Sequence, residues 1–191
     1  MTVFWRQGYE GASMAELTKA MGINAPSLYA CFGNKEGLFR AVVDRYDARR
    51  EAFMEGILAQ PTAHGVAEAY LQGVAAFCAD TGGQKPPGCL MLKGALSCCE
   101  DALTKDMSRR RAEKEAALKK RFEQARKTGD LPASANPAAL ARYLSVMAMG
   151  LSAQAAAGAS AKELREVANV ALAGWPGGAA PTVKSRAKAT A

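Results

Sequence analysis

The stretch GINAPSLYACFGNKEGLF, residues 22–39, holds one helix stop and two helix starts within a short run of chain. Gly22 can adopt the left-handed conformation that ends a helix, and Asn24 can accept the hydrogen bonds that begin the next one. Gly33 and Asn34 repeat these signals before a longer apolar pattern. The helix between them has only about eight residues, and a helix of that length is unstable in isolation. Neighbouring helices must hold it, and we expect its exposed face to have a binding role.

The residues before Gly22 predict another short helix. Ser13 stands three residues before Glu16, which is the capping-box pattern of a helix that runs to about Met21. Two short helices joined by a turn that contains Gly are typical of a helix-turn-helix unit, although other helical hairpins share this pattern. The second helix would expose small or hydrogen-bonding side chains that suit the major groove of DNA. These side chains are Asn24, Ala25, Ser27, Tyr29 and Ala30.

Lys35 begins the next helix, where the helix dipole disfavours a cation. A residue in a locally unfavourable position suggests an external partner, and a DNA phosphate would supply the anion. The alternative is an exposed lysine with no such role. For Tyr29 the alternative is a half-buried core position, but its neighbour Leu28 already fills the inward position.

The rest of the chain also predicts helices, so we expect an all-α fold. Alanine is abundant, and the sequence has no long runs of β-branched residues. Two loop-like segments, QPTAHG and DTGGQKPPG, separate the middle helices. Residues 176–191 have little to bury and should form a disordered basic tail. Helices are expected from Asn34 to about Ala59, between the two loops, from Gly88 to about Cys99, onward to Thr128, and at about 137–157 and 160–174.

Charge and residue inventory narrow the function classes. The net charge is +7, but the basic excess lies in residues 109–127 and in the tail. Acidic residues interleave the first of these runs, which favours a solvated helix face, so charge alone does not decide the function. The five cysteines lack disulfide or zinc spacing, and His64, the only histidine, is interpreted as a solvated loop residue. We therefore expect no enzyme, no catalytic residues, no metal and no cofactor.

Nothing in the sequence predicts a membrane partner. A membrane-spanning helix needs roughly 18–20 apolar residues. Residues 146–159 come nearest, and Ser152 and Gln154 interrupt them. The start of the chain, MTVFWRQGYEG, lacks the apolar core and cleavage site of a secretory signal, so we expect a cytoplasmic protein.

A specific pattern runs through residues 4–43. It begins as Phe-x-x-x-Gly-Tyr followed by a serine, continues as Gly-Ile-Asn and Leu-Tyr-x-x-Phe, and ends as Lys-Glu-x-Leu. This region closely resembles the DNA-binding domain of TetR-family transcriptional repressors, and the later helices resemble the family's ligand-binding and dimerisation domain more diffusely. The residues that carry the resemblance are Phe4, Gly8, Tyr9, Ser13, Gly22, Asn24, Leu28, Tyr29, Phe32, Lys35, Glu36 and Leu38.

The resemblance implies a homodimer that binds a palindromic operator in double-stranded DNA and is released by a small-molecule effector. It implies a three-helix DNA-binding domain at residues 1–46 and an effector-binding and dimerisation domain at 47–175. By the same resemblance, Ser13, Tyr29 and Lys35 would hold phosphates. The bases would be approached by Asn24, Ala25, Pro26 and Ser27.

The sequence departs from the family in its first helix, of which only MTVFWRQ precedes Gly8-Tyr9. Either Met1 is an internal methionine, which we favour because this segment is typical of the second half of an amphipathic helix, or DNA binding is weakened. The alternative function is therefore a helical ligand-binding dimer that has lost DNA binding. Dimerisation is expected from residues 137–174, whose many small residues permit close helix packing.

The family places an effector cavity among the middle helices. Methionine-rich and aromatic linings adapt to apolar ligands, although ordinary core packing is the alternative for each residue. Cys89 would lie in the first turn of a helix, with Lys93 one turn later, an arrangement that favours a thiolate. The alternative is a small buried apolar residue, which is the usual role of a free cysteine. Because some TetR-family repressors sense oxidants through a cysteine, a thiol-reactive effector is a second possibility. The candidate pocket residues are Met54, Tyr70, Phe77, Cys89, Leu92, Leu96 and Met147.

Overall fold

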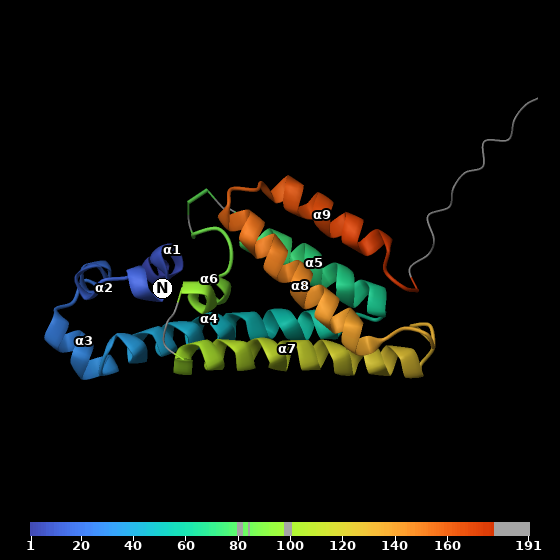
Figure 1. The fold of residues 1–191 in the computed structure, drawn as a ribbon, viewed down its shortest axis with the longest axis horizontal. Helices are drawn as coiled ribbons and strands as arrows, with labels where there is room; N and C mark the ends of the chain where they lie inside the picture. Colours follow the sequence, from blue (N-terminus) through green and yellow to red (C-terminus); the bar gives the residue numbers. More distant parts are fainter. Residues whose placement is uncertain (80–81, 84, 98–100, 178–191) are drawn as a thin grey trace, which may run out of the picture.

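The computed structural model describes residues 1–79, 82–83, 85–97 and 101–177, and its regular elements in these ranges are all helices. The all-α prediction is confirmed. Figure 1 shows short helices gathered at one end of an elongated molecule, while one long helix runs from this end beneath the larger bundle. In chain order the helices are α1 (Thr2–Gly11), α2 (Met14–Met21), α3 (Ala25–Phe32), α4 (Lys35–Leu58), α5 (Ala63–Cys78), α6 (Leu90–Ser97), α7 (Asp101–Lys127), α8 (Pro137–Ala156) and α9 (Ala161–Ala173).

The predicted caps of the first helices are present. The Ser13 hydroxyl accepts from the backbone N–H of Glu16 at 3.2 Å, and the Glu16 carboxylate accepts from the backbone N–H of Ser13 at 3.2 Å. Gly22 ends α2 in the left-handed region, with φ of 66°. Asn24 Oδ1 accepts from Ser27 N at 2.8 Å to begin α3. These local contacts fix the lengths of α2 and α3.

The first turn of α4 packs so closely on the end of α3 that position 37 requires glycine. Asn34 Oδ1 accepts from Gly37 N at 2.7 Å and begins α4. A Cβ atom at Gly37 would lie only 2.0 Å from the backbone oxygen of Phe32, so the end of α3 and the start of α4 touch backbone to backbone. This contact fixes the angle between α3 and α4.

An aromatic core joins α1 to the rest of the N-terminal helices. The Phe4 ring meets the Phe39 ring of α4 edge-on at 5.0 Å, and Tyr9 meets the same ring at 5.2 Å. Trp5 meets Tyr46 at 5.2 Å. The same buried cluster includes residues of α6 and α7, so the core at this end continues into the middle of the chain. These residues are Leu90, Met91, Leu103 and Met107.

The larger core lies among α5, α7, α8 and α9. Leu71 of α5, Phe122 of α7, Leu144 of α8 and Leu164 of α9 are each almost fully buried in it. Trp175 follows α9 and packs on Phe122, with ring centres 5.4 Å apart. Of the predicted tail, residues 178–191 lie outside the described residues.

Two helix starts differ from the sequence-based expectation. His64 was expected in a loop, but Thr62 Oγ1 accepts from Gly65 N at 3.0 Å and starts α5 at Ala63, so His64 lies in the first turn of that helix. The helix expected from Gly88 begins at Leu90, because Gly88 has a φ of 85°. The predicted end of this helix near Cys99 lies outside the described residues.

Candidate DNA interface and effector cavity

The exposed face of α3 carries the side chains predicted to meet DNA. Leu28 is fully buried beneath the helix, whereas Tyr29 is 49% exposed. Tyr29 therefore does not occupy the half-buried core position that was its alternative. The residues at the start of the helix are also exposed; they are Asn24, Ala25, Pro26 and Ser27. α3 thus presents a largely small-residue surface flanked by one phenol.

Ser13 and Asn24 already use part of their hydrogen-bonding capacity as helix caps. The Ser13 hydroxyl donates to Glu16 Oε2 at 2.7 Å and accepts from Glu16 N. Asn24 Oδ1 accepts from Ser27 N, which leaves its amide N–H groups as the donors open to a partner. A phosphate or base at these positions would meet side chains whose orientation is set in advance.

Lys35 has partners within the chain. Its Nζ donates to the backbone oxygen of Glu10 at 3.2 Å and lies 4.7 Å from the centre of the Tyr9 ring. The unfavourable position at the start of α4 is thus offset by a carbonyl near the end of α1. An external anion is not needed to explain why a lysine stands there.

A cavity of about 150 Å³ lies among α4, α5, α6, α7 and α8. Of the predicted pocket residues, Tyr70, Phe77, Cys89 and Leu92 line it. Met54 instead points into the larger core, where it is 6% exposed. Met147 packs against the same core, because the cavity face of α8 is carried by its neighbours Ser145, Ala148, Met149 and Ser152. The side chain of Leu96 lies outside the described part of the structure.

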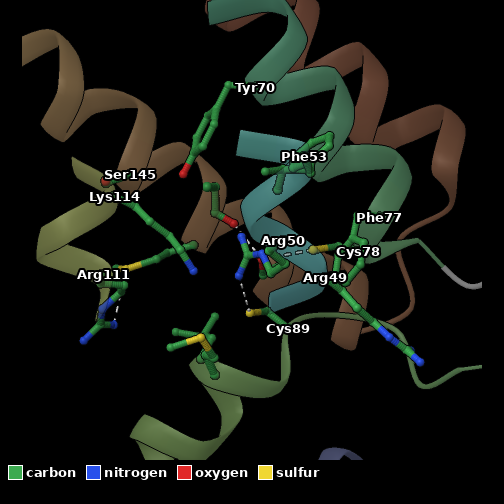
Figure 2. Close-up of a pocket in the computed structure, with 16 residues that line it drawn as sticks. Arg49, Arg50, Phe53, Tyr70, Phe77, Cys78, Cys89, Arg111, Lys114 and Ser145 are labelled. Atoms are coloured by element: carbon green, nitrogen blue, oxygen red, sulfur yellow. Dashed lines mark hydrogen bonds between the residues drawn. The ribbon is translucent and has the colours of Figure 1, made fainter. Parts of the chain in front are cut away.

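The polar lining was missed by the sequence analysis, which considered mainly apolar, aromatic and sulfur-containing side chains. Figure 2 shows Arg50 in the middle of the cavity, with its guanidinium beside Cys89. Arg49, Arg111 and Lys114 are the other charged lining residues. The last two belong to the basic run at 109–127, whose interleaved acidic residues suggested a wholly solvated face.

The neighbours of Cys89 differ from those expected. Cys89 precedes α6 instead of lying in its first turn, and the Lys93 Nζ donates to the backbone oxygen of Arg6 at 2.5 Å. The cation beside Cys89 is Arg50, whose Nη1 lies 3.7 Å from the sulfur. The Tyr46 hydroxyl donates to the same sulfur at 3.3 Å.

Several groups around Arg50 remain neutral at physiological pH. Burial raises the pKa of the Tyr46 phenol and that of the Tyr70 phenol above the ordinary range of tyrosine. Burial also raises the pKa of the Cys78 thiol, whose sulfur lies 3.2 Å from Ser152 Oγ. Desolvation disfavours the charged form of each group. None of these three side chains therefore supplies a negative charge to Arg50.

Comparisons with known proteins agree with this arrangement. Residues 1–42 match the family model described as bacterial regulatory proteins, tetR family. The HTH-type transcriptional repressor ComR of Escherichia coli (strain K12) is 34% identical over 180 residues, which cover 92% of this chain and 85% of ComR. The chain belongs to the tetR family. This TetR-family chain is a transcriptional regulator with a DNA-binding helix-turn-helix domain.

Two solved TetR-type structures extend the comparison. A cysteine mutant of the TetR-family regulator CifR, complexed with 26-base-pair operator DNA, superposes with a TM-score of 0.85 at 35% identity, over 92% of each chain. The reduced form of E. coli NemR shares the fold, with a TM-score of 0.74 at 22% identity over 88% of each chain. Within the described ranges of this TetR-family chain, no helix is both long and apolar enough to cross a membrane. Among the same residues, no group of His, Cys, Asp and Glu side chains could hold a metal ion.

Proposed function

We propose that this TetR-family regulator is a homodimeric repressor that leaves its operator when a small molecule enters the cavity described above. Residues 1–46 would bind DNA and residues 47–175 would bind the effector and form the dimer. The observation that carries this proposal is the course of α4. One uninterrupted helix places Leu38 and Phe39 in the N-terminal core and Arg50 and Phe53 at the cavity.

A second connection runs through α6. Met91 belongs to the core that holds α1 and also lines the cavity. Gly94 fits against Phe39 and Met107 so closely that an added Cβ atom would lie 3.0 Å from each of them. A ligand that separates α4 from α6 would therefore shift the base of the helix-turn-helix unit. Such a ligand favours the released state by its difference in affinity for the two arrangements.

The proposed dimer surface lies on α8 and α9. Val146, Val167 and Val170 are 53%, 46% and 77% exposed. Tyr143 and Met149 are exposed on the same pair of helices. An apolar surface of this kind is typical of an interface, and two helices from each subunit would form a four-helix bundle with two-fold symmetry. That symmetry would match a palindromic operator.

On DNA, α3 would enter the major groove. Asn24, Ala25, Pro26 and Ser27 would approach the bases, and Ser13, Tyr29 and Lys35 would contact phosphates. As a regulator of bacterial DNA, the protein would act in the cytoplasm. No catalytic role is assigned to any residue.

The test is fluorescence anisotropy with labelled DNA fragments from upstream of the protein's own gene. We expect salt-dependent binding to one fragment at nanomolar to sub-micromolar protein, and weaker binding to a fragment of scrambled sequence. The control is Tyr29→Ala, which leaves the core intact because Tyr29 is exposed, and which should weaken binding. If the protein dimerises but prefers none of the fragments, the proposed repressor function is wrong, and a ligand-binding dimer without DNA binding takes its place.

A further inference from the structure

The charged side chains on the described cavity wall are all positive. The charged residues that line it are Arg49, Arg50, Arg111 and Lys114, and no described lining residue is acidic. Lys114 forms an ion pair with Asp47, and Arg111 donates to Ser108 Oγ at 3.2 Å. Arg49 is exposed and extends away from the centre of the cavity (Figure 2). The positive charge at the centre therefore comes mainly from Arg50.

Arg50 has no carboxylate partner among the described residues. A guanidinium has five N–H donors, and the hydrogen bond that Arg50 makes is the long one to Cys89 Sγ at 3.7 Å. Its other neighbours are the rings of Tyr46 and Phe77, whose centres lie 5.6 and 5.8 Å from Cζ. A partly buried cation without a counter-ion is costly, unless a ligand supplies the opposite charge.

Tyr70 provides a second unsatisfied donor at the same place. The residue is only 6% exposed and lines the cavity. Its hydroxyl points into the cavity in Figure 2 and has no hydrogen-bond partner in the described part of the chain. This hydroxyl can therefore donate to an acceptor that enters the cavity.

The remaining wall is apolar and partly aromatic. Phe53, Val74, Phe77, Leu92 and Ala148 surround the polar centre. An empty cavity of about 150 Å³ in another protein holds a molecule the size of benzene, so the ligand here is compact. An inorganic phosphate could pair with Arg50, but the apolar side chains of the wall would remain in contact with water.

We propose that the effector of this cavity is a small organic carboxylate, whose oxygens accept hydrogen bonds from Arg50 and Tyr70 and whose apolar body packs against Phe53 and Phe77. The proposal names the ligand class for the effector site and rests on the proposed function. A carboxylate matches the fork of a guanidinium with two parallel hydrogen bonds, which a neutral alcohol or amide cannot do.

The test uses the full-length protein and two matched pairs of probes: benzoate with benzyl alcohol, and hexanoate with hexanol. Binding is measured by isothermal titration calorimetry without DNA. We expect at least one carboxylate to bind about tenfold or more tightly than its neutral counterpart, as a hydrogen bond to a charged group predicts. If both carboxylates bind no better than the alcohols, the proposal is overturned.

Variants separate a specific contact from general charge. Arg50→Gln should weaken carboxylate binding about tenfold or more and leave alcohol binding unchanged, and Tyr70→Phe should weaken it several-fold. The control is Arg45→Gln on the same helix, which removes an equal charge from an exposed residue that does not line the cavity. Equal losses for Arg45→Gln and Arg50→Gln would overturn the proposal. Thermal melts establish that each variant is folded. Arg50→Lys keeps the positive charge but cannot make two parallel hydrogen bonds to a carboxylate, so its loss of carboxylate affinity should be smaller than that of Arg50→Gln.

A parallel anisotropy measurement distinguishes this inference from the proposed function. Carboxylate binding that leaves the operator complex intact would contradict release by an effector but support the anion site. Operator binding that persists while no carboxylate binds would contradict the anion site alone.

Discussion

Lys35 Nζ donates a hydrogen bond to the backbone oxygen of Glu10, at 3.2 Å, and so ties the first residue of α4 to the end of α1. The same ammonium lies over the Tyr9 ring. A residue proposed to contact a phosphate therefore also holds the N-terminal helices together. Any change at Lys35 must be judged by both roles.

Lys35→Ala should weaken binding to all DNA sequences alike and reduce the salt dependence by roughly one phosphate contact. Loss of the bond to Glu10 should also lower the free energy of unfolding by about 1 kcal/mol. Anisotropy at several salt concentrations and a thermal melt measure the two effects. The control is Lys127→Ala, at the end of α7 that Figure 1 places far from α3. A lower melting temperature with an unchanged salt slope would leave Lys35 with the structural role only.

Ser27→Ala should change the preference among DNA sites instead of lowering affinity uniformly. Ser27 is exposed at the start of α3, and a good base contact is worth about 1–3 kcal/mol. Competition between the operator and single-base variants measures the effect. Because Asn24 Oδ1 accepts from the backbone N–H of Ser27 and not from its side chain, the cap survives the substitution. An equal loss of affinity for every site would place Ser27 away from the bases.

Val170→Glu should convert the proposed dimer into a monomer. Val170 is 77% exposed on α9. In the dimer the two introduced carboxylates would repel each other and would lose their hydration in an apolar interface, which destabilises it. Sedimentation velocity at micromolar concentration measures the state, and Ala102→Glu at an exposed position of α7 is the control. A wild-type protein that sediments as a monomer would remove the dimer from the proposed function.

Arg50→Met should leave the free energy of unfolding unchanged or raise it, by up to about 4 kcal/mol, although it abolishes carboxylate binding. Replacing a buried charge by an apolar side chain of similar length is often neutral or stabilising. Chemical denaturation without ligand measures this. A loss of several kcal/mol would instead indicate that Arg50 has a structural partner within the chain.

Cys89 should react with iodoacetamide at neutral pH faster than Cys78. Cys78 is 2% exposed, and burial raises the pKa of its thiol. Cys89 lines the cavity, so a bound carboxylate should slow its labelling. Peptide mass spectrometry measures the rates, with the exposed Cys31 as a reference for an accessible thiol. If Cys89→Ser leaves an oxidant response of operator binding intact, a thiol-reactive effector is ruled out as the releasing signal.

The predictions that succeeded depend on residues close together in the chain. Ser13 with Glu16, Asn24 with Ser27, and the left-handed Gly22 are each contained within one helical turn, and the structure has all of them. The position of Cys89 was missed because Gly88 takes a positive φ and delays the helix. Lone glycines can end, begin or interrupt a helix, and the sequence did not distinguish these roles.

The polar centre of the cavity depends on contacts between distant segments. Nothing near Arg50 in the sequence says that it faces a cavity instead of water, since basic and acidic residues alternate around it on α4 as they would on a solvated helix. Lys114 and Arg111 lie in a run whose charges alternate as they would on a solvated helix. Only the packing of α7 against α4 and α8 turns part of that run inward.

The pairing of Asp47 with α7 has a consequence for the signal itself. Asp47 is three residues before Arg50 on α4, close enough for a direct ion pair along the helix, but its carboxylate is held by Lys114 and Arg110. By pairing with Asp47, α7 therefore keeps this carboxylate from forming an ion pair with Arg50 in place of a ligand. A change such as Lys114→Ala would leave Asp47 with Arg110 alone and would allow its carboxylate to turn toward Arg50 and pair with the guanidinium. The regulator would then keep its fold and its DNA binding but no longer respond to its effector, because Arg50 would already be paired within the chain.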